Sequence, residues 1–189
     1  ILKFILQKEY GLNVCIFSID DFYKTKNERI KMSKQVHHLF LTRGVPGTHD
    51  VNLLNKTLKE LKQKKFKRVL IPKFDKSIDD RSKMNKWQKV DNPPHLIIFE
   101  GWCVGAKHQK NIDLLKPLNK VERMHDPKCK WRKAVNNYLK NQYKKIFKKI
   151  DKMIYLKVPN FDYILKWRWL QEQKMKLTSK NKRTMSKQQ

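Results

Sequence analysis

The chain lacks any long apolar run. No stretch of its 189 residues approaches the roughly 18 consecutive apolar residues of a membrane-spanning helix. The first residues do not have the pattern of a secretory signal, because Lys3 and Lys8 interrupt the apolar segment. These absences predict a soluble, intracellular protein without membrane association, and we expect it in the cytoplasm.

Cysteine is also scarce. Cys15, Cys103 and Cys129 make an odd number, and no two of them form a C-x-x-C pair. This spacing argues against a disulfide framework and against a four-cysteine zinc site. His125 lies four residues before Cys129, but a metal site there would need further ligands at suitable spacing. We therefore expect reduced thiols.

Acidic residues are few compared with basic ones. Asp and Glu number 17 against 45 Lys and Arg, which gives a net charge of +28. Such an excess raises nucleic acid as a partner. However, most of the basic residues are lysines spread over every predicted helix, whereas readers of bases and phosphates favour arginine. We expect nonspecific binding to polyanions and no specific nucleic acid.

Short apolar runs indicate where the strands lie. Runs rich in β-branched and aromatic residues predict buried parallel strands. They cover residues 14–18, 68–72, 96–99 and 153–157. Residues 73–94 show little periodicity and predict a long loop.

Helical periodicity fills the intervals between these runs. Residues before Gly11 have the pattern of the tail of a helix, and Asp50 can cap a later one. The other predicted helices span about 28–41, 51–65, 131–149 and 161–177. In the third of these, Gln142 is expected on the apolar face. Strands that alternate with helices predict an α/β fold with a three-layer parallel sheet.

Carboxylates follow two of the predicted strands. Asp20 and Asp21 come after the first run, and Glu100 ends the third. Because parallel α/β sheets bind ligands at the carboxyl ends of their strands, we expect these side chains to share one crevice. One carboxylate can deprotonate an acceptor hydroxyl, another can hold hydrated Mg²⁺, and loop cations can neutralise a phosphoryl group. The pattern predicts phosphoryl transfer.

Six segments, in order along the chain, resemble motifs of the D-glycerate 3-kinase and related P-loop kinase family. This family is itself similar to uridine kinases, pantothenate kinases and phosphoribulokinases. The resemblance covers about residues 1–188 and is more specific for the family than for its substrate. The segments are Ser18–Tyr23, Arg43–Asp50, Pro72–Arg81, Phe99–Ala106, Trp131–Asn136 and Trp167–Glu172.

The resemblance implies an ATP- and Mg²⁺-dependent kinase that phosphorylates a hydroxyl of D-glycerate or a similar hydroxy acid. Asp20 matches the general base and a metal contact, with Asp21 assisting. Glu100 matches the acidic residue that acts on Mg²⁺, mostly through water. Arg168 resembles a lid arginine that closes over the phosphates of the nucleotide, as both a catalytic and an ATP-binding residue.

The resemblance also implies an acceptor site in the loops, where an arginine fork would suit a substrate carboxylate. Its expected residues are Tyr23, Arg43, His49, Asp50 and Arg81. For two of the site residues a purely structural alternative stays open. His49 could be a neighbour of a helix cap, and Arg168 could be a solvated helix residue.

The chain departs from the resembled family in one respect. No G-x-x-x-x-G-K-[ST] motif occurs in the 189 residues, and Gly101–Lys107 has the wrong spacing for one. In the resembled fold this phosphate loop lies between an N-terminal strand and the first helix. We therefore expect residues 1–177 to form one incomplete kinase domain without that strand and loop. Residues 178–189 are expected to be a polar tail, a C-terminal region cut short, and the fragment is expected to be inactive by itself.

Two other functions remain open from the sequence. One is a basic nucleic-acid-binding protein on a degenerate kinase fold, which would bind with a preference that survives moderate salt. The other is a kinase for a nucleoside or another small alcohol.

Overall fold

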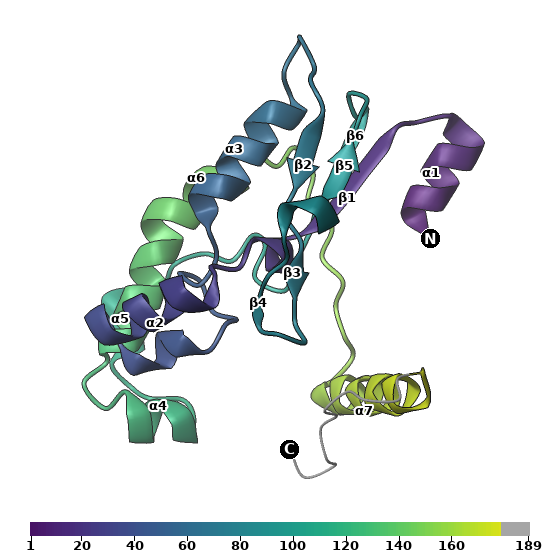
Figure 1. Ribbon diagram of the computed structural model, residues 1–189. Helices are drawn as coiled ribbons and strands as arrows, with labels where there is room; N and C mark the ends of the chain where they lie inside the picture. Colours follow the sequence, from purple (N-terminus) through teal and green to yellow (C-terminus); the bar gives the residue numbers. More distant parts are fainter. Residues whose placement is uncertain (179–189) are drawn as a thin grey trace. The chain divides into compact units, whose positions relative to one another are not determined.

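The strand before Asp20 and the strand that ends at Glu100 form a parallel pair (Figure 1). β1 (Val14–Ser18) lies beside β6 (Leu96–Glu100), in a register that places Phe17 opposite Phe99 and Ser18 opposite Glu100. Both strands are the apolar runs expected from the sequence. Since the two strands are parallel, their carboxyl ends lie at the same edge.

The computed structural model describes residues 1–178. Residues 1–151 form one compact unit, and a second unit begins at Lys152. The predicted polar tail, 178–189, lies outside the described residues except for Thr178, which ends the last helix. The expectation of a single domain over 1–177 stays a prediction.

Two further strand pairs are antiparallel. β2 (Val69–Ile71) pairs with β5 (Gln88–Val90), and β3 (Phe74–Asp75) pairs with β4 (Asp80–Arg81). The buried strand expected at 68–72 is confirmed, but it pairs antiparallel and not parallel as expected. The long loop expected over 73–94 is wrong. That segment holds three short strands and the 3₁₀ turn η3 (Met84–Lys86). Strands of two or three residues are too short to show alternation in a sequence.

The helices of the first unit begin with α1 (Leu2–Tyr10), which ends at Gly11 in the left-handed conformation with φ of 61°. The carboxylate of Asp50 accepts a hydrogen bond from the backbone N–H of Leu53 at 3.0 Å, so the predicted cap is confirmed. The remaining helical elements are η1 (Ile19–Phe22), α2 (Lys26–Gln35), η2 (His38–Leu41), α3 (Val51–Leu61), η4 (Asn111–Leu114), α4 (Lys120–His125), α5 (Lys130–Tyr138), the π-helical turn η5 (Leu139–Tyr143) and α6 (Lys144–Phe147).

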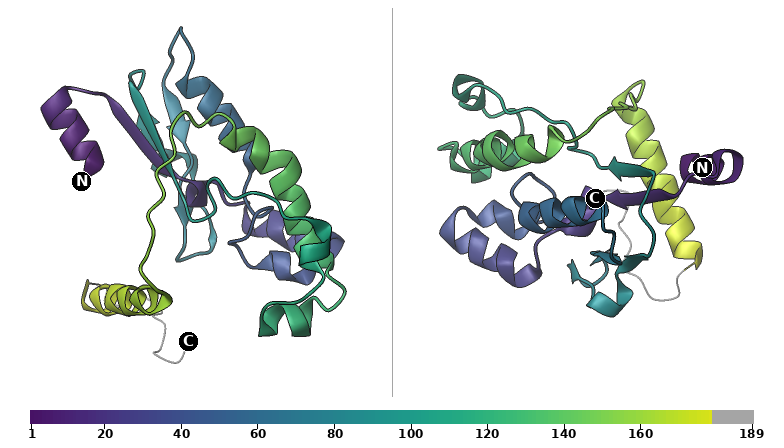
Figure 2. Two further views of the ribbon diagram at one scale, coloured as in Figure 1. Left: turned by 180° about the vertical axis from the view of Figure 1, so that it is seen from behind. Right: turned by 90° about the horizontal axis from the view of Figure 1, so that it is seen from above.

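One hydrophobic cluster joins the strands to two of the helices. In Figures 1 and 2, α3 and α6 run side by side next to β2. Leu54 of α3, Ile71 of β2 and Tyr143 of η5 are all buried members of this cluster. Gln142, expected on the apolar face of its helix, is instead exposed, and the next residue, Tyr143, is buried. The cluster therefore fixes η5 against the strands.

As far as residue 178, the second unit consists of a segment without regular structure followed by a helix. The strand expected at 153–157 is wrong, because this segment pairs with no other among residues 1–178. Its apolar side chains from Met153 to Leu156 are 53–86% exposed. A strand needs a neighbour for its backbone N–H and C=O groups. The last predicted helix is confirmed as α7 (Phe161–Thr178). Across the described part of the chain, no helix is both long and apolar enough to span a bilayer.

Candidate active site

The turn after β1 fixes the two neighbouring aspartates differently. The Ser18 side chain accepts a hydrogen bond from the backbone N–H of Asp20, and the carboxylate of Asp21 accepts one from the backbone N–H of Ser18, both at 3.2 Å. This reciprocal cap holds Asp21 back against the end of the strand. Asp20 projects beyond it, with its side chain 24% exposed.

Glu100 lies at the same edge. It is the last residue of β6, directly opposite Ser18 in the parallel register, and it is exposed. The register therefore brings Asp20 and Glu100 to the ends of neighbouring strands, as the sequence predicts. The catalytic and metal roles expected for them stay predictions.

The glycine after Glu100 allows the two strand ends to approach. A Cβ atom on Gly101 would lie 2.4 Å from Cγ2 of Ile19, a residue that is fully buried. No side chain fits in that space without moving η1. The Glu-Gly pair is thus explained by close packing at the strand end.

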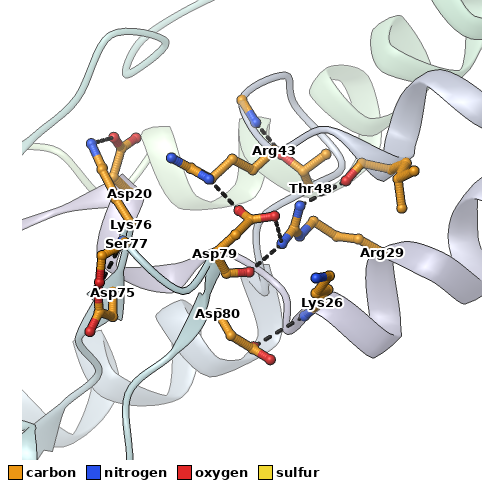
Figure 3. Close-up of polar contacts among 12 residues, drawn as sticks. Asp20, Lys26, Arg29, Arg43, Thr48, Asp75, Lys76, Ser77, Asp79 and Asp80 are labelled. Carbon is orange, nitrogen blue, oxygen red and sulfur yellow. Dashed lines mark hydrogen bonds and ion pairs between the residues drawn. The ribbon is translucent and has the colours of Figure 1, made fainter. Parts of the chain in front are cut away.

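Two lysines pair with the two aspartates. Nζ of Lys76 donates to Oδ2 of Asp20 at 2.8 Å, as Figure 3 shows, and Nζ of Lys73 lies 3.1 Å from Oδ1 of Asp21. Both lysine side chains are about 60% exposed (59% and 61%). Sequence reasoning missed them, although both belong to the Pro72–Arg81 segment that carries part of the family resemblance.

The other oxygen of Asp20 has no partner. Oδ1 is buried, and no hydrogen-bond donor reaches it within residues 1–178. A buried acceptor without a donor is costly, so such atoms commonly mark the place of a ligand, a water or an ion. Asp20 therefore offers one paired oxygen and one open oxygen.

Tyr23 and His49 form a second, buried part of the site. Their segments are joined by backbone hydrogen bonds from Lys24 N–H to the Thr48 carbonyl at 2.8 Å and from Asp50 N–H to the Phe22 carbonyl at 2.7 Å. The Tyr23 ring stacks on the His49 ring, with centroids 4.4 Å apart and planes at 19°. These contacts place His49 in the interior, beside the cap residue Asp50 of α3.

Burial sets the protonation of both rings. It raises the pKa of Tyr23, and the neighbouring carboxylate of Asp20 raises it further. Burial lowers the pKa of His49 to about 4, against a smaller opposing influence of Asp20. At neutral pH His49 is a neutral imidazole and Tyr23 a neutral phenol.

The two predicted acceptor-site arginines are held by carboxylates of the protein. Nη2 of Arg81 donates to the Tyr23 carbonyl at 3.0 Å and to Oδ2 of Asp50 at 3.3 Å. Arg43 pairs with Asp79 (Figure 3). The structure therefore brings Tyr23, Asp50 and Arg81 together, while Arg43 lies in a separate ion-pair group.

That group contains an arginine that sequence reasoning missed. Arg29 is 1% exposed, ion-pairs with Asp79 at 2.9 Å, and donates to the carbonyls of Leu41 and Asp79, both at 2.7 Å (Figure 3). Nothing in its neighbourhood in the sequence distinguishes it from a solvated residue of α2. Its partners are 12 and 50 residues away along the chain.

Arg168 belongs to the second unit. It pairs with Glu172 at 2.7 Å and donates to the side chain of Gln171 at 3.0 Å, so the expected shared face is present. Its side chain is 50% exposed. Its action on the phosphates stays a prediction.

The edge of the parallel strand pair where Asp20, Asp21 and Glu100 lie, called the acidic edge below, fits a magnesium ion better than a transition metal. No group of three or more His, Cys, Asp or Glu side chains suited to hold a metal occurs among residues 1–178. Asp20 and Glu100 offer only oxygen ligands, which suit Mg²⁺, an ion that keeps most of its waters and needs one or two carboxylates. Burial raises the pKa of Cys15 and of Cys103 to about 11, so these thiols stay protonated.

Comparison with known proteins finds kinases among the relatives of the chain. The chain is 34% identical over 173 residues to the uncharacterized kinase mug58 of Schizosaccharomyces pombe, covering 87% of this chain and 61% of that protein. It is 30% identical over 159 residues to the chloroplastic D-glycerate 3-kinase of Arabidopsis thaliana, covering 80% of this chain and 32% of that one. The chain thus spans less than two thirds of the length of these curated relatives.

A solved structure matches the whole chain. The D-glycerate 3-kinase from Cryptococcus neoformans superposes with a TM-score of 0.83 and 28% identity, over 100% of this chain and 68% of that one. No family model matches the chain. The predicted α/β kinase fold is confirmed. By sequence and by fold, the chain is similar to D-glycerate 3-kinases and related kinases.

Proposed function

We propose that the protein transfers a phosphoryl group from ATP to a hydroxyl of D-glycerate or a similar small hydroxy acid. The likeness to kinases supports the reaction class, and the likeness to D-glycerate 3-kinases supports the acceptor. The observation that carries the proposal is the parallel register that sets Ser18 opposite Glu100 and so brings Asp20 and Glu100 to one edge.

In the proposed reaction, Asp20 accepts the proton of the acceptor hydroxyl. The hydroxyl oxygen forms a bond to the terminal phosphorus of ATP while the bond from that phosphorus to ADP breaks. Asp20 and Glu100 would hold hydrated Mg²⁺, which when bound neutralises charge on the phosphates. Asp21, tied to the strand end, supports this arrangement, and Arg168 would neutralise further phosphate charge.

The acceptor lies, in this proposal, against Tyr23, His49, Asp50 and Arg81, with Arg43 nearby. The exposed Lys73 and Lys76 supply cations that suit the carboxylate of a hydroxy acid. A hydroxy acid therefore fits the edge better than an uncharged alcohol does. A nucleoside kinase, the other enzyme class considered, would gain nothing from these two lysines.

ATP binding needs its own test, because the 189 residues hold no G-x-x-x-x-G-K-[ST] loop. We expect the isolated chain to bind ATP weakly, as measured by titration calorimetry with Mg²⁺ present. Binding with ordinary kinase affinity would show that the nucleotide is held by another arrangement of these residues.

The decisive experiment measures ATP-dependent phosphorylation of D-glycerate by the chain and by any longer reading frame that contains it. In the active form, Asp20→Asn should lower kcat by about 10³-fold with little change in KM for the acceptor. Asp75→Asn is the matched control, since Asp75 lies next to Lys76 on the β3–β4 hairpin and its side chain bonds to Ser77. Unchanged turnover in Asp20→Asn would remove Asp20 from the reaction, and uridine as the preferred acceptor would exchange the substrate class.

A further inference from the structure

The hydroxyl of Tyr143 lies between the backbone of one loop residue and the ring of another. It accepts a hydrogen bond from the backbone N–H of Gly47 at 2.8 Å, and it lies 2.7 Å from Nδ1 of His49. Tyr143 is 1% exposed and His49 is fully buried. The π-helical turn η5 therefore delivers a phenol to the acceptor-site loop from about 95 residues further along the chain.

A count of protons identifies the tautomer of His49. If the phenol donates to Nδ1, the imidazole carries its proton on Nε2, and Nε2–H is the one group left without a partner. If Nδ1–H donates to the phenol, both the phenolic proton and the Nε2 lone pair are left without partners among residues 1–178. The first arrangement leaves fewer buried polar groups unsatisfied.

The hydrogen bond that the phenol oxygen accepts also favours the first arrangement. The backbone N–H of Gly47 donates to this oxygen at 2.8 Å, so the phenolic proton must point elsewhere. Full burial disfavours the doubly protonated imidazole, so only one ring nitrogen has a proton. His49 then has a single proton, on Nε2.

Two orphaned atoms of opposite kind result. Nε2 of His49 is a buried donor and Oδ1 of Asp20 a buried acceptor, and neither has a partner among residues 1–178. Tyr23 lies between the two side chains, because its ring stacks on His49 and the nearby Asp20 carboxylate raises the pKa of its hydroxyl. Asp20 is also the charged group with the largest influence on the His49 ring, followed by Lys24.

We propose that Tyr143 is a positioning residue that holds His49 in the Nε2–H tautomer, so that the imidazole donates a hydrogen bond to the acceptor alcohol while Asp20 accepts the alcohol's proton. An alcohol is the ligand whose oxygen can accept from one such group and whose hydrogen can be given to the other. This assignment rests on the proposed function for the identity of the ligand, and on the Tyr143–His49 geometry for the tautomer.

The first test measures the tautomer directly. Long-range ¹H–¹⁵N correlation spectra of the ¹⁵N-labelled chain, at neutral pH, should show His49 protonated on Nε2. Tyr143→Phe should abolish this single form, whereas Tyr138→Phe should keep it, since Tyr138 is a neighbouring tyrosine for which residues 1–178 provide no hydrogen bond. Protonation on Nδ1 in the unmodified chain overturns the proposal, and this measurement requires no variant to fold.

The second test takes the terminal hydroxyl of D-glycerate as the acceptor, as the likeness to D-glycerate 3-kinases suggests, and compares D-glycerate with D-lactate, which lacks that hydroxyl. D-glycerate should shift the His49 Nε2–H signal, and D-lactate should leave it in place. An equal shift with both acids overturns the proposed contact. In the active enzyme, Tyr143→Phe should raise KM for D-glycerate about tenfold, with KM for ATP unchanged.

The two failures can be told apart. The expected tautomer without any response to D-glycerate would reject D-glycerate as the substrate and leave the positioning role of Tyr143 supported. The opposite tautomer in an enzyme that phosphorylates D-glycerate would reject the positioning role and leave the proposed function standing.

Discussion

Two groups of ion pairs in the first unit differ in residue type and in burial. Arg29 and Arg132, 1% and 7% exposed, pair with Asp79 and Asp126 and also donate to backbone carbonyls. The lysine pairs of the acidic edge, described above, use one ammonium group and one carboxylate each and are open to solvent. Arginine joins chain segments here, while lysine covers the carboxylates of the candidate site.

The difference follows from the chemistry of the two cations. A planar guanidinium can satisfy a carboxylate and several carbonyls at once, which offsets the cost of burying it, whereas an ammonium group is a strongly hydrated point charge. Exposed lysine pairs contribute little to stability, and their lysines can easily pair with another anion instead. The arginine pairs are therefore scaffold, and the lysine pairs can yield to a ligand.

The stabilising role of the buried arginine pairs is tested most directly at Arg29. Arg29→Met keeps the volume but leaves the carbonyls of Leu41 and Asp79 without their donors, so we expect a loss of about 3 kcal/mol in the free energy of unfolding. Urea denaturation followed by circular dichroism measures it. Arg68→Met is the control, because Arg68 and Asp91 form an exposed pair, and its cost should stay below about 1 kcal/mol. Equal losses would contradict the scaffold role.

The acidic edge can also be disturbed without changing a charge. Gly101→Ala places a methyl group against the buried Ile19, and we expect about 2 kcal/mol of destabilisation from overpacking. The matched control is Gly44→Ala, where a Cβ would meet nothing within 4 Å, although φ of 141° adds strain there too. Thermal unfolding of both variants measures the difference. A smaller loss at Gly101 than at Gly44 would show that the strand ends can separate freely.

The pH dependence of the free energy of unfolding tests the buried pair of Asp126 and Arg132. Burial would raise the pKa of Asp126, but hydrogen bonds from the backbone N–H groups of Arg132 and Trp131 and from the Arg132 guanidinium outweigh it and lower the pKa below 3.8. The ionised carboxylate thus stabilises the fold above pH 3.8, and this stabilisation is lost as the pH falls through the lowered pKa.

Asp126→Asn should therefore reduce the dependence of unfolding free energy on pH below about pH 4, by up to about 1.4 kcal/mol per pH unit. Urea titrations at a series of acidic pH values measure this slope. Asp91→Asn removes an exposed carboxylate as a control. A slope that is unchanged in Asp126→Asn would show that Asp126 does not lose its proton differently in the two states.

The smallest effect is expected at the lysines. Lys76→Met removes an exposed ion pair and should change the free energy of unfolding by no more than about 0.5 kcal/mol. Lys86→Met, an exposed residue of η3, is the control. A loss of stability comparable to that of Arg29→Met would show that Lys76 stabilises the fold as the buried arginines do. The proposed difference between the arginine and lysine pairs would then be wrong.

The strand ends of the acidic edge could be predicted because local chemistry determines them. An apolar run followed by a carboxylate, a cap before a helix and a glycine after one are all signals within a few residues, and they located Asp20, Glu100, Asp50 and Gly11 correctly in their elements. The family resemblance added the order of the segments.

What could not be predicted depends on partners far along the chain. Arg29 and Asn136 have the sequence signature of solvated helix residues, yet both are buried, because carbonyl and amide groups 12 to 50 residues away satisfy them. The regular spacing of a helix placed Gln142 on the apolar face of the predicted helix and left Tyr143 off it. The short strands of the 73–94 segment are fixed by pairing and leave no periodicity.

The lysines of the β3–β4 hairpin have a consequence for the order of events in the proposed reaction. Oδ2 of Asp20 is paired with an ammonium group that any incoming carboxylate can attract. A hydroxy acid brings such a carboxylate together with the alcohol to be activated. Its arrival would draw Lys76 away and free both oxygens of Asp20 when the alcohol is present.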